Sequence, residues 1–363
     1  MGAGPLLIMA GGTGGHVYPA LAVADYLREK GVTVLWLGTR AGLEYKVVPG
    51  KGYRLLTIDF RGVRGKKMDK WIIAPFLLIR AVLQAAVILF RNRPAAALGM
   101  GGFASAPGGI AAWLMRVPLL IHEQNSVAGT TNRLLKPMAR LIMEGFPGTF
   151  KTGLKVRDTG NPVRTQITRL PAPDDRLKSY PGRPFRLLVL GGSQGAKALN
   201  EMVPATLASV EKDIDLQVWH QTGEGHYEGV KKLYEKVEPP INARIDAFID
   251  DMAQAYAWAD LALCRAGALT IAEICAAGVA SILVPFPYAV DDHQTGNARY
   301  LSDKGCALLI PESELESRGL AGLISDIAKS PARLLEMSRS TREQARPEAT
   351  RDVAELCLEV MHG

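Results

Sequence analysis

Short apolar runs alternate with longer segments of helical period along most of the chain. In the first half, these runs are at 6–10, 32–37, 54–58, 95–98, 119–122 and 141–143. After the first run, Ala20, Val23, Ala24 and Leu27 repeat at the spacing of one helix face. Apolar runs of this length between turn residues are typical of buried parallel strands. The pattern therefore predicts an α/β fold with a doubly wound, mostly parallel sheet.

The same pattern begins again halfway along the chain. Phe185 to Leu190 is another apolar run that leads through glycines into a helical segment. Further apolar runs follow at 216–219, 244–248, 261–264, 281–284 and 307–310. The stretch 170–183 is rich in proline, glycine and charge, which is typical of an interdomain linker. We expect 161–183 to act as the hinge between the two domains. We expect one domain over 1–163, joined by a returning helix at 346–363, and a second domain over 164–345.

Glycine loops and polar clusters follow three runs of the first half. Gly11 to Gly15 precede His16, Gly99 to Gly109 follow the fourth run, and His122 to Ser126 follow the fifth. Parallel strands end at one edge of the sheet, where the amides of the next helices favour anions. The unperturbed pKa of a histidine side chain is near neutral, which makes His16 a candidate proton acceptor. The alternatives are a structural turn or a helix cap at His16, and a cap for the next helix at 122–126.

The second half carries polar residues at two more strand ends. A strand end, a glycine turn and a helix start run from Cys264 to Glu273. A helix start presents roughly half a positive charge to a pyrophosphate, and Glu273 can accept both hydroxyls of a ribose. The alternative for Glu273 is a capping box with Thr270. The next run ends at Val284, and the polar residues from Asp291 to Ala298 after it suit a sugar ligand.

Composition narrows the class of protein. With 48% hydrophobic and 22% charged residues, the 363-residue chain forms a globular protein of about two domains. Its 43 basic and 36 acidic residues give a net charge of +7, which favours an anionic partner such as a nucleotide sugar or a phospholipid surface. Its 4 cysteines lie in apolar surroundings without metal-ligand spacing. Because no secretory signal precedes the first run, we expect a cytoplasmic protein.

The most apolar segment is Trp71 to Phe90, which reads WIIAPFLLIRAVLQAAVILF. Its length approaches that of a membrane span, but Pro75, Arg80 and Gln84 interrupt it. The basic residues that flank it are Arg61, Arg64, Lys66, Lys67, Lys70, Arg91 and Arg93. We expect a helix that rests on an anionic membrane surface, where each nearby Lys or Arg contributes roughly 1 kcal/mol. A crossover helix with its apolar face in the core is the alternative.

Eight motifs occur in a specific order and spacing. They lie at 11–16, 101–103, 122–125, 160–164, 191–196, 248–252, 265–273 and 284–298. Together they resemble the MurG family of N-acetylglucosaminyltransferases, which convert lipid I to lipid II in bacterial peptidoglycan synthesis. The resemblance implies a GT-B fold, with two Rossmann-like domains facing each other across a cleft. It also implies UDP-GlcNAc and lipid I as partners, with no nucleic acid, and a peripheral position at the cytoplasmic face of the plasma membrane.

The resemblance also assigns roles to individual residues. It implies that His16 is the base that takes the proton from the C4 hydroxyl of N-acetylmuramic acid in an inverting transfer. In the amino-terminal domain, the residues implied to close the site are Thr13, Gly14, Gly15, Asn125 and Arg164. In the second domain, the residues implied to bind the donor are Ser193 at the diphosphate, Ile249 at the uracil, Ala268, Leu269 and Thr270 at the helix start, Glu273 at the ribose, and Gln294 and Asn297 near the sugar.

The expected chemistry requires neither a metal nor a cofactor. Helix dipoles and backbone amides can stabilise a leaving UDP without a divalent cation. The pair Asp250-Asp251 begins a helical segment, where helix capping is the expected role. Three other interpretations stay open at this point. They are a GT-B enzyme with another lipid acceptor such as diacylglycerol, an NADP-dependent oxidoreductase with Arg40 at the 2′-phosphate, and an inactive membrane-associated scaffold.

Overall fold

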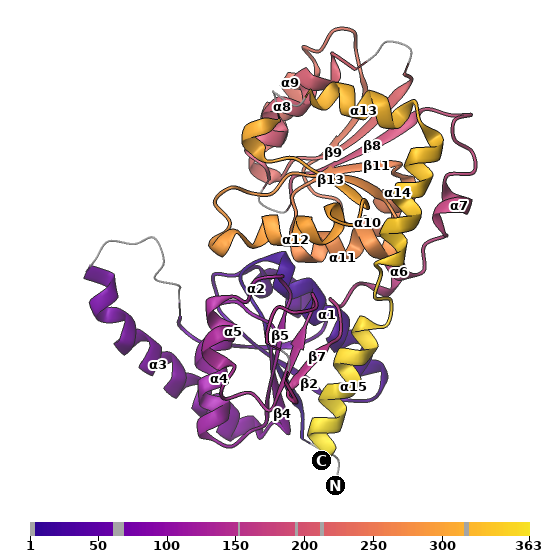
Figure 1. The fold of residues 1–363 in the computed structure, drawn as a ribbon. Helices are drawn as coiled ribbons and strands as arrows, with labels where there is room; N and C mark the ends of the chain where they lie inside the picture. The colour runs from indigo at the N-terminus through magenta and orange to yellow at the C-terminus, as the bar shows by residue number, and fades with distance from the viewer. Residues whose placement is uncertain (1–3, 61–68, 152, 193–194, 211–213, 316–318) are drawn as a thin grey trace. The chain divides into compact units, whose positions relative to one another are not determined.

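The chain divides into two compact units, each built around a parallel β-sheet (Figure 1). The computed structural model describes residues 4–60, 69–151, 153–192, 195–210, 214–315 and 319–363. Unit 1 consists of Met1–Arg164 with Pro347–Gly363, and unit 2 consists of Thr165–Arg346. The predicted α/β fold with doubly wound parallel sheets is confirmed.

The sheet of unit 1 has the strand order β3-β2-β1-β4-β5-β6-β7, and every described pair is parallel. The strands are β1 (Leu6–Met9), β2 (Val34–Gly38), β3 (Arg54–Thr57), β4 (Ala96–Gly99), β5 (Leu119–Glu123), β6 (Leu141–Glu144) and β7 (Val156–Asp158). In β1, Leu6 and Ile8 pack into the core on one face, and Leu7 and Met9 pack into the core on the other. Burial on both faces explains why the strands read as continuous apolar runs.

Helices cover both faces of this sheet. The helices are α1 (Gly14–Glu29), α2 (Leu43–Gly50) and α15 (Ala349–His362) on one face, and α3 (Asp69–Asn92), α4 (Ser105–Leu114) and α5 (Thr130–Leu135) on the other. The last helix returns to unit 1 and packs on α1, where Tyr26 Oη donates to Glu355 Oε1 at 2.9 Å. Its buried residues Val353, Ala354 and Cys357 join the same core as β1. The carboxy-terminal segment is therefore part of the first hydrophobic core.

Unit 2 repeats the design with the strand order β10-β9-β8-β11-β12-β13. Its strands are β8 (Phe185–Leu190), β9 (Leu216–Gln221), β10 (Asn242–Asp246), β11 (Leu261–Cys264), β12 (Ala280–Leu283) and β13 (Ala307–Leu309). Its α-helices are α6 (Thr165–Thr168), α7 (Pro173–Arg176), α8 (Lys197–Leu207), α9 (Tyr227–Tyr234), α10 (Met252–Trp258), α11 (Ala268–Ala277), α12 (His293–Ser302), α13 (Leu320–Ala328) and α14 (Pro331–Glu343). Short 3₁₀ turns occupy η1 (Glu224–His226), η2 (Val290–Asp292) and η3 (Glu312–Glu314).

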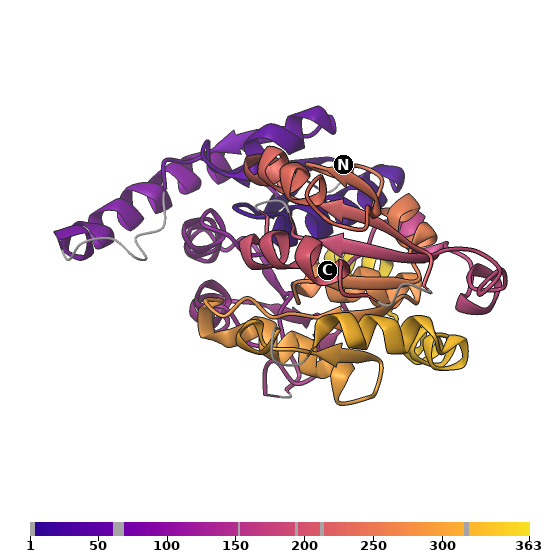
Figure 2. The same cartoon turned by 90° about the horizontal axis from the view of Figure 1, so that it is seen from above.

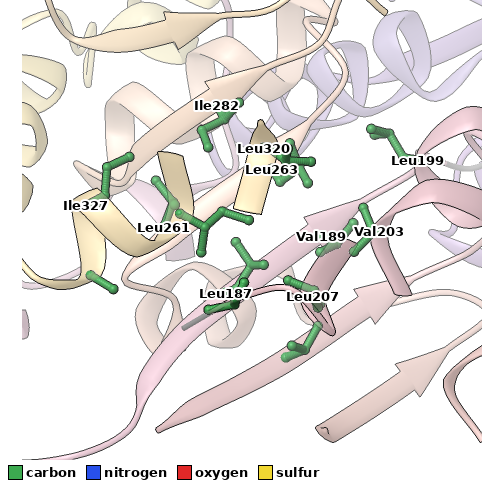
Figure 3. Close-up of a cluster of buried hydrophobic side chains, with 14 of the residues drawn as sticks. Leu187, Val189, Leu199, Val203, Leu207, Leu261, Leu263, Ile282, Leu320 and Ile327 are labelled. Atoms are coloured by element: carbon green, nitrogen blue, oxygen red, sulfur yellow. The ribbon is translucent and has the colours of Figure 1, made fainter. Parts of the chain in front are cut away.

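Branched apolar side chains fill the core of unit 2 (Figure 3). Alternate residues of β8 and β11 point into this core, as Leu187 and Leu263 do. Residues of α8 and α13 cover them, among them Val203 and Ile327. The period of two along β8 and β11 places these side chains on one face of the sheet, where the helices cover them.

Both sheets change winding direction at one strand pair. In unit 1 this point lies between β1 and β4, and in unit 2 it lies between β8 and β11. Helices that leave neighbouring strands there go to opposite faces and leave the carboxyl ends of the strands uncovered. Ligands of open α/β sheets bind at this position. The fold therefore points to the loops after β1, β4, β8 and β11.

Some element boundaries differ from the prediction. β10 spans Asn242–Asp246 instead of 244–248, so Phe248 and Ile249 lie beyond the strand. β7 was not predicted, because three residues with one apolar member form no recognisable run. α1 begins at Gly14, ahead of Ala20, the first residue of the predicted helix face, since glycines carry no helical signal. These errors are local.

The predicted linker packs on unit 2. Arg176 donates through Nη2 to the carbonyl of Gly278 at 2.7 Å. Arg183 contacts both carboxylate oxygens of the buried Asp260, at 2.7 and 2.6 Å. On the other side, Thr350 Oγ1 donates to the carbonyl of Val163 within unit 1 at 3.0 Å. These contacts attach the linker to unit 2 at Arg176 and Arg183. The segment that can bend as a hinge is therefore shorter than the expected range 161–183.

Candidate active site

The glycine loops after β1 and β4 contact each other at the switch point of unit 1. Gly101 and Gly102 have φ values of +92° and +87°, which favour glycine. A Cβ on Gly102 would lie 2.2 Å from the carbonyl oxygen of Gly11, so no side chain fits between the loops. Ser105 Oγ lies 2.7 Å from the carbonyl oxygens of both Met9 and Gly101 and fixes the second loop to β1. The glycines are needed for this close approach of two backbones.

His16 lies in the first turn of α1, between these loops. A Cβ on Gly101 would lie 2.8 Å from Cδ2 of the imidazole, so the ring packs directly against that glycine. Its Nδ1 lies 3.2 Å from the carbonyl oxygen of Gly11. A carbonyl oxygen only accepts, so Nδ1 carries the proton and Nε2 has the lone pair in the neutral ring. His16 is partly exposed, and the arrangement leaves Nε2 able to accept a proton.

The cluster after β5 is largely structural. Glu123 Oε2 accepts from the backbone N–H of Gly129 and from Asn132 Nδ2, both at 2.9 Å, at the start of α5. The capping interpretation therefore holds for Glu123. Its Oε1 accepts from the N–H and the side-chain amide of Asn125, at 3.0 and 3.2 Å. Asn125 is partly exposed at the edge where His16 lies, held by this carboxylate.

His122 is a buried, neutral histidine. Its Nε2 donates to the carbonyl oxygen of Gly160 at 3.0 Å, and its Nδ1 accepts from Gln124 Nε2 at 3.2 Å. Burial lowers the pKa of His122 to about 4. The side chain therefore fastens the loop before Val163 to the end of β5 and takes no part in proton transfer at neutral pH.

The remaining predicted residues of unit 1 surround the start of α1. Thr13 is the N-cap residue, exposed and in extended conformation, and Gly14 and Gly15 open the helix. The guanidinium of Arg164 lies 5.5 Å from the centre of the Tyr18 ring, and this ring packs against Gly14. The structure thus brings Arg164 to the same helix start as His16.

In unit 2, α11 begins at the carboxyl end of β11. Gly267 is its N-cap residue, so Ala268, Leu269 and Thr270 form the first turn. Ala268 is buried, whereas Leu269 and Thr270 are partly exposed. The first-turn N–H groups of such a helix form an anion site at the switch point of this sheet.

Glu273 lies further along α11 and is buried at 4% exposure. Tyr256 Oη donates to its Oε2 at 3.2 Å. The capping-box alternative is wrong, because the N-cap residue is Gly267 and Thr270 already lies within the first turn. Tyr256 was missed in the sequence, since nothing in the spacing of α10 and α11 signals this contact.

Two of the other residues predicted to bind the sugar nucleotide form hydrogen bonds with loops near α11. Asn297 is fully buried and donates through Nδ2 to the carbonyl of Ala266 at 3.1 Å. Gln294 Oε1 accepts from the N–H of Phe286 at 2.9 Å, in the loop after β12. Ile249 is buried and follows β10. Ser193 lies outside the described residues.

The acidic pair Asp250-Asp251 lies where a helix begins. Asp251 caps α10 by accepting from the N–H of Gln254 at 2.9 Å, which confirms the capping prediction. The sequence contains an Asp-x-Asp at 213–215, but Asp215 immediately precedes β9, at the amino edge of its sheet. Among the described residues, no three His, Cys, Asp or Glu side chains cluster as a metal site requires.

Glu44 is a further residue of this region that the sequence did not reveal. It lies in the first turn of α2, is buried at 1% exposure, and accepts from the N–H of Gly12 at 2.8 Å. A buried carboxylate next to a glycine loop is recognisable only once the strand order places β2 beside β1.

The fold is that of GT-B glycosyltransferases, with two doubly wound parallel sheets and candidate sites at both switch points. Residues 6–143 match the glycosyltransferase family 28 N-terminal domain, and residues 186–353 match the glycosyltransferase family 28 C-terminal domain. The chain belongs to glycosyltransferase family 28.

Individual relatives agree with this family. The chain is 53% identical, over 99% of both chains, to the UDP-N-acetylglucosamine--N-acetylmuramyl-(pentapeptide) pyrophosphoryl-undecaprenol N-acetylglucosamine transferase of Nitrosococcus oceani. The crystal structure of Acinetobacter baumannii MurG superposes with a TM-score of 0.83 at 39% identity, over 98% of this chain and 99% of that one. The glycosyltransferase of kitacinnamycin shares the fold, with a TM-score of 0.74 at 16% identity over 99% of both chains.

We predict that His122 makes stability depend on pH. Its pKa is 6.5 ordinarily and about 4 in the folded state, so only the unfolded chain takes up a proton between these values. Stability is therefore lost as pH falls from about 6.5 to about 4, by about 3 kcal/mol. His122→Gln keeps a donor for the Gly160 carbonyl and does not titrate.

Urea unfolding at a series of pH values measures this effect. The free energy of unfolding of His122→Gln should fall less steeply over this window than that of the unmodified chain. A residual slope is expected from His220, whose pKa burial lowers to about 3. Equal slopes for the two proteins would contradict the prediction.

Proposed function

We propose that this chain transfers N-acetylglucosamine from UDP-GlcNAc to the C4 hydroxyl of the N-acetylmuramoyl unit of lipid I, giving lipid II. The observation that carries the proposal is the near-complete, 53% identical match to a relative with this donor and acceptor in its name. The activity places the chain in peptidoglycan synthesis, and hence in cell-wall biogenesis, cell shape and cell division.

The two units divide the substrates between them. Unit 2 binds UDP-GlcNAc, with the diphosphate at the first turn of α11 and the ribose at Glu273. Unit 1 binds lipid I at the loops around the start of α1. The support for this division is that each unit has its glycine loop and helix start at its own switch point. Closure of the units on the donor then requires bending only where the linker is not attached to unit 2.

His16 is the general base of the reaction. Its Nε2 takes the proton of the C4 hydroxyl while that oxygen forms a bond to the anomeric carbon of GlcNAc. The bond from this carbon to the UDP oxygen breaks, and its electron pair leaves with UDP. Attack opposite to UDP inverts the configuration and gives a β(1→4) bond. The proposal is supported by the hydrogen bond from Nδ1 to the carbonyl of Gly11, which leaves Nε2 as the acceptor.

The negative charge that develops on UDP is met by backbone dipoles. The α11 start contributes partial positive charge without a metal or cofactor. Asn297 holds the loop that leads into this helix start, through the carbonyl of Ala266, and Gln294 holds the loop after β12. Preorganised donors of this kind cost no reorganisation during the reaction.

Transfer of labelled GlcNAc from UDP-GlcNAc to a lipid I analogue, with EDTA present, tests the donor, the acceptor and the metal independence. We predict transfer by the unmodified chain and at least a tenfold loss in kcat/KM for Glu273→Ala, roughly the worth of one or two hydrogen bonds to a charged group. Tyr256→Phe, which removes only the donor to Glu273, serves as the milder comparison. A folded chain that binds UDP but acts on diacylglycerol would overturn the acceptor assignment.

Replacement of His16 tests the base. His16→Ala should lower kcat by roughly 10²- to 10⁴-fold, because general base catalysis contributes about that much. Binding of UDP-GlcNAc, measured by calorimetry, should remain, since unit 2 binds the donor. A variant that keeps normal turnover would remove His16 from the mechanism.

We further propose that α3 rests on an anionic membrane surface. The segment Ala74–Asn92 is long and apolar enough for a membrane span by length and composition, yet only 17% of it is buried. One face of α3 packs in the core of unit 1 through Ala81, Ala85 and Leu89. That packing supports a helix lying on the membrane surface, since the same face cannot contact lipid.

The other face of α3 is apolar and exposed. Phe76, Leu83 and Phe90 are 71%, 62% and 69% exposed, and Ile79 and Val87 lie with them along the helix. In both views the amino-terminal part of α3 extends beyond the other helices of unit 1 (Figures 1 and 2). Apolar side chains on a surface of this kind favour a membrane contact.

Basic residues extend this surface. Arg80, Arg91 and Arg93 are exposed on and after α3. Of the preceding basic residues, Arg61, Arg64, Lys66 and Lys67 lie outside the described residues. These charges favour the anionic cytoplasmic leaflet, where lipid I would present its sugar to unit 1. We therefore place the enzyme at the cytoplasmic face of the plasma membrane as a peripheral protein.

Binding to phosphatidylglycerol vesicles tests the membrane contact. Leu83→Asp should weaken vesicle binding by roughly tenfold or more, because it removes a large apolar side chain and adds a repelled charge. Tyr45→Asp is the matched control, since Tyr45 is 51% exposed on α2, across the sheet from α3. The proposed membrane contact is contradicted if both variants bind vesicles as tightly as the unmodified chain does.

A further inference from the structure

A buried carboxylate holds the loop that carries His16. Glu44 Oε2 accepts from the N–H of Gly12 at 2.8 Å. Its Oε1 accepts from the N–H and from Oγ1 of Thr39, both at 2.9 Å. Both oxygens act only as acceptors in these contacts, which is the role of an ionised carboxylate. Glu44 thus joins the end of β2 to the loop after β1.

The surrounding chain is shaped to admit this carboxylate. Cβ atoms on Gly11, Gly38 and Gly42 would lie 2.5, 2.6 and 1.9 Å from atoms of the Glu44 side chain. Three glycines from two loops and a strand end therefore leave the room that the carboxylate fills. None of them needs a left-handed φ, since no positive φ occurs at these positions. Glycine is required at these positions because it has no side chain, and not because of its backbone freedom.

The hydrogen bonds of Glu44 and His16 meet on one peptide group. The N–H of Gly12, which Glu44 accepts, and the carbonyl of Gly11, which His16 Nδ1 contacts at 3.2 Å, belong to the same planar unit. In a trans peptide they point in opposite directions. The hydrogen-bonded chain therefore runs from the Glu44 carboxylate, through the N–H and C=O of this peptide, to the imidazole N–H of His16.

We infer that Glu44 is a positioning residue for the His16 base and acts through the Gly11–Gly12 peptide. The carboxylate fixes the peptide plane, and the peptide carbonyl keeps the proton on Nδ1, so that Nε2 faces the acceptor. The negative charge of Glu44 also polarises the peptide and strengthens the carbonyl as an acceptor. This stabilises the imidazolium formed when Nε2 takes the hydroxyl proton. A carboxylate that contacts a catalytic histidine directly has the same two effects.

The inference rests on the proposed role of His16, and the experiment separates the two. Glu44→Gln removes the charge and leaves one acceptor oxygen for two backbone N–H groups. Glu144→Gln is the matched control. Glu144 is 5% exposed in the same unit and accepts from the N–H groups of Gly148 and Phe150, at 2.9 and 3.0 Å, without a link to His16.

Two measurements are made on each folded protein. Nitrogen NMR of chains labelled with ¹⁵N-histidine, with His16 assigned by its absence in His16→Ala, reports which ring nitrogen carries the proton. Steady-state transfer to a lipid I analogue reports kcat and the KM for UDP-GlcNAc. In the unmodified chain, we expect the proton on Nδ1 of His16.

Glu44→Gln should shift His16 toward the other tautomer and lower kcat by roughly 10- to 100-fold, less than loss of the base itself, with little change in KM. In the His16→Ala background, the Glu44→Gln effect on kcat should disappear, because Glu44 acts through His16. Glu144→Gln should change neither the tautomer nor kcat. Purely structural damage by Glu44→Gln would instead persist in the His16→Ala background.

Several results would overturn the inference. One is a proton on Nε2 of His16 in the unmodified chain, which is decisive even if Glu44→Gln does not fold. Another is an unchanged tautomer and kcat in folded Glu44→Gln while His16→Ala is inactive, which leaves His16 as the base. Normal turnover of His16→Ala would instead remove the proposed base itself, and this inference with it.

Discussion

The parallel direction of the strands is the constraint on which the rest of the structure depends. Every described strand pair in both sheets is parallel, so the carboxyl ends within each sheet lie along one edge. Each strand needs a crossover, and the crossover helices start at that edge with their N–H groups directed outward. A site for a diphosphate therefore follows from strand direction before any side chain is considered. The side chains then decide which anion binds and what reaction occurs.

Close backbone approach at the first switch point adds the second constraint. Gly101 and Gly102 bring one loop against the imidazole of His16 and against Gly11. A larger residue at either position would move the ring or separate the loops. The hydrogen bond from Nδ1 to the Gly11 carbonyl then selects one tautomer of the neutral histidine. In this way the packing of the two loops keeps the proton of His16 on Nδ1, and the buried carboxylate of Glu44 holds the peptide whose carbonyl accepts it.

Burial distinguishes His122 and His220 from His16. Both His122 and His220 are fully buried, and burial lowers the pKa of each well below neutral pH. His122 connects the loop at Gly160 to the end of β5, and His220 connects β9 to Asn200 of α8 and Tyr234 of α9. His16 is partly exposed at the carboxyl edge of its sheet. Burial thus gives two histidines a structural role and leaves the third accessible to water.

The amino-acid sequence by itself determined every strand except β7, the presence of helices that cross between the strands, and the loops at the strand ends. Buried parallel strands must be apolar on both faces, so their positions appear directly as apolar runs, as at Leu6 to Met9. Glycine loops after such runs identified the edge that binds anions. Eight motifs in order identified the family. The exposed apolar face of α3 was also visible in composition, because a core helix would not need so many apolar residues around it.

Only the tertiary structure decided the contacts between segments far apart in the chain. Whether Glu273 caps a helix depends on where α11 begins, and its start at Ala268 places Glu273 beyond the first turn. The packing of α10 on α11 then brings Tyr256 to the carboxylate. The role of Glu44 depends on β2 lying beside β1, because this strand order brings the Glu44 carboxylate to the N–H of Gly12. Sequence periodicity reports which face of an element is buried, but hydrogen-bond partners are set by strand order and packing. For this reason the edge that carries the candidate site could be read from the sequence, whereas the orientation of the His16 ring could not.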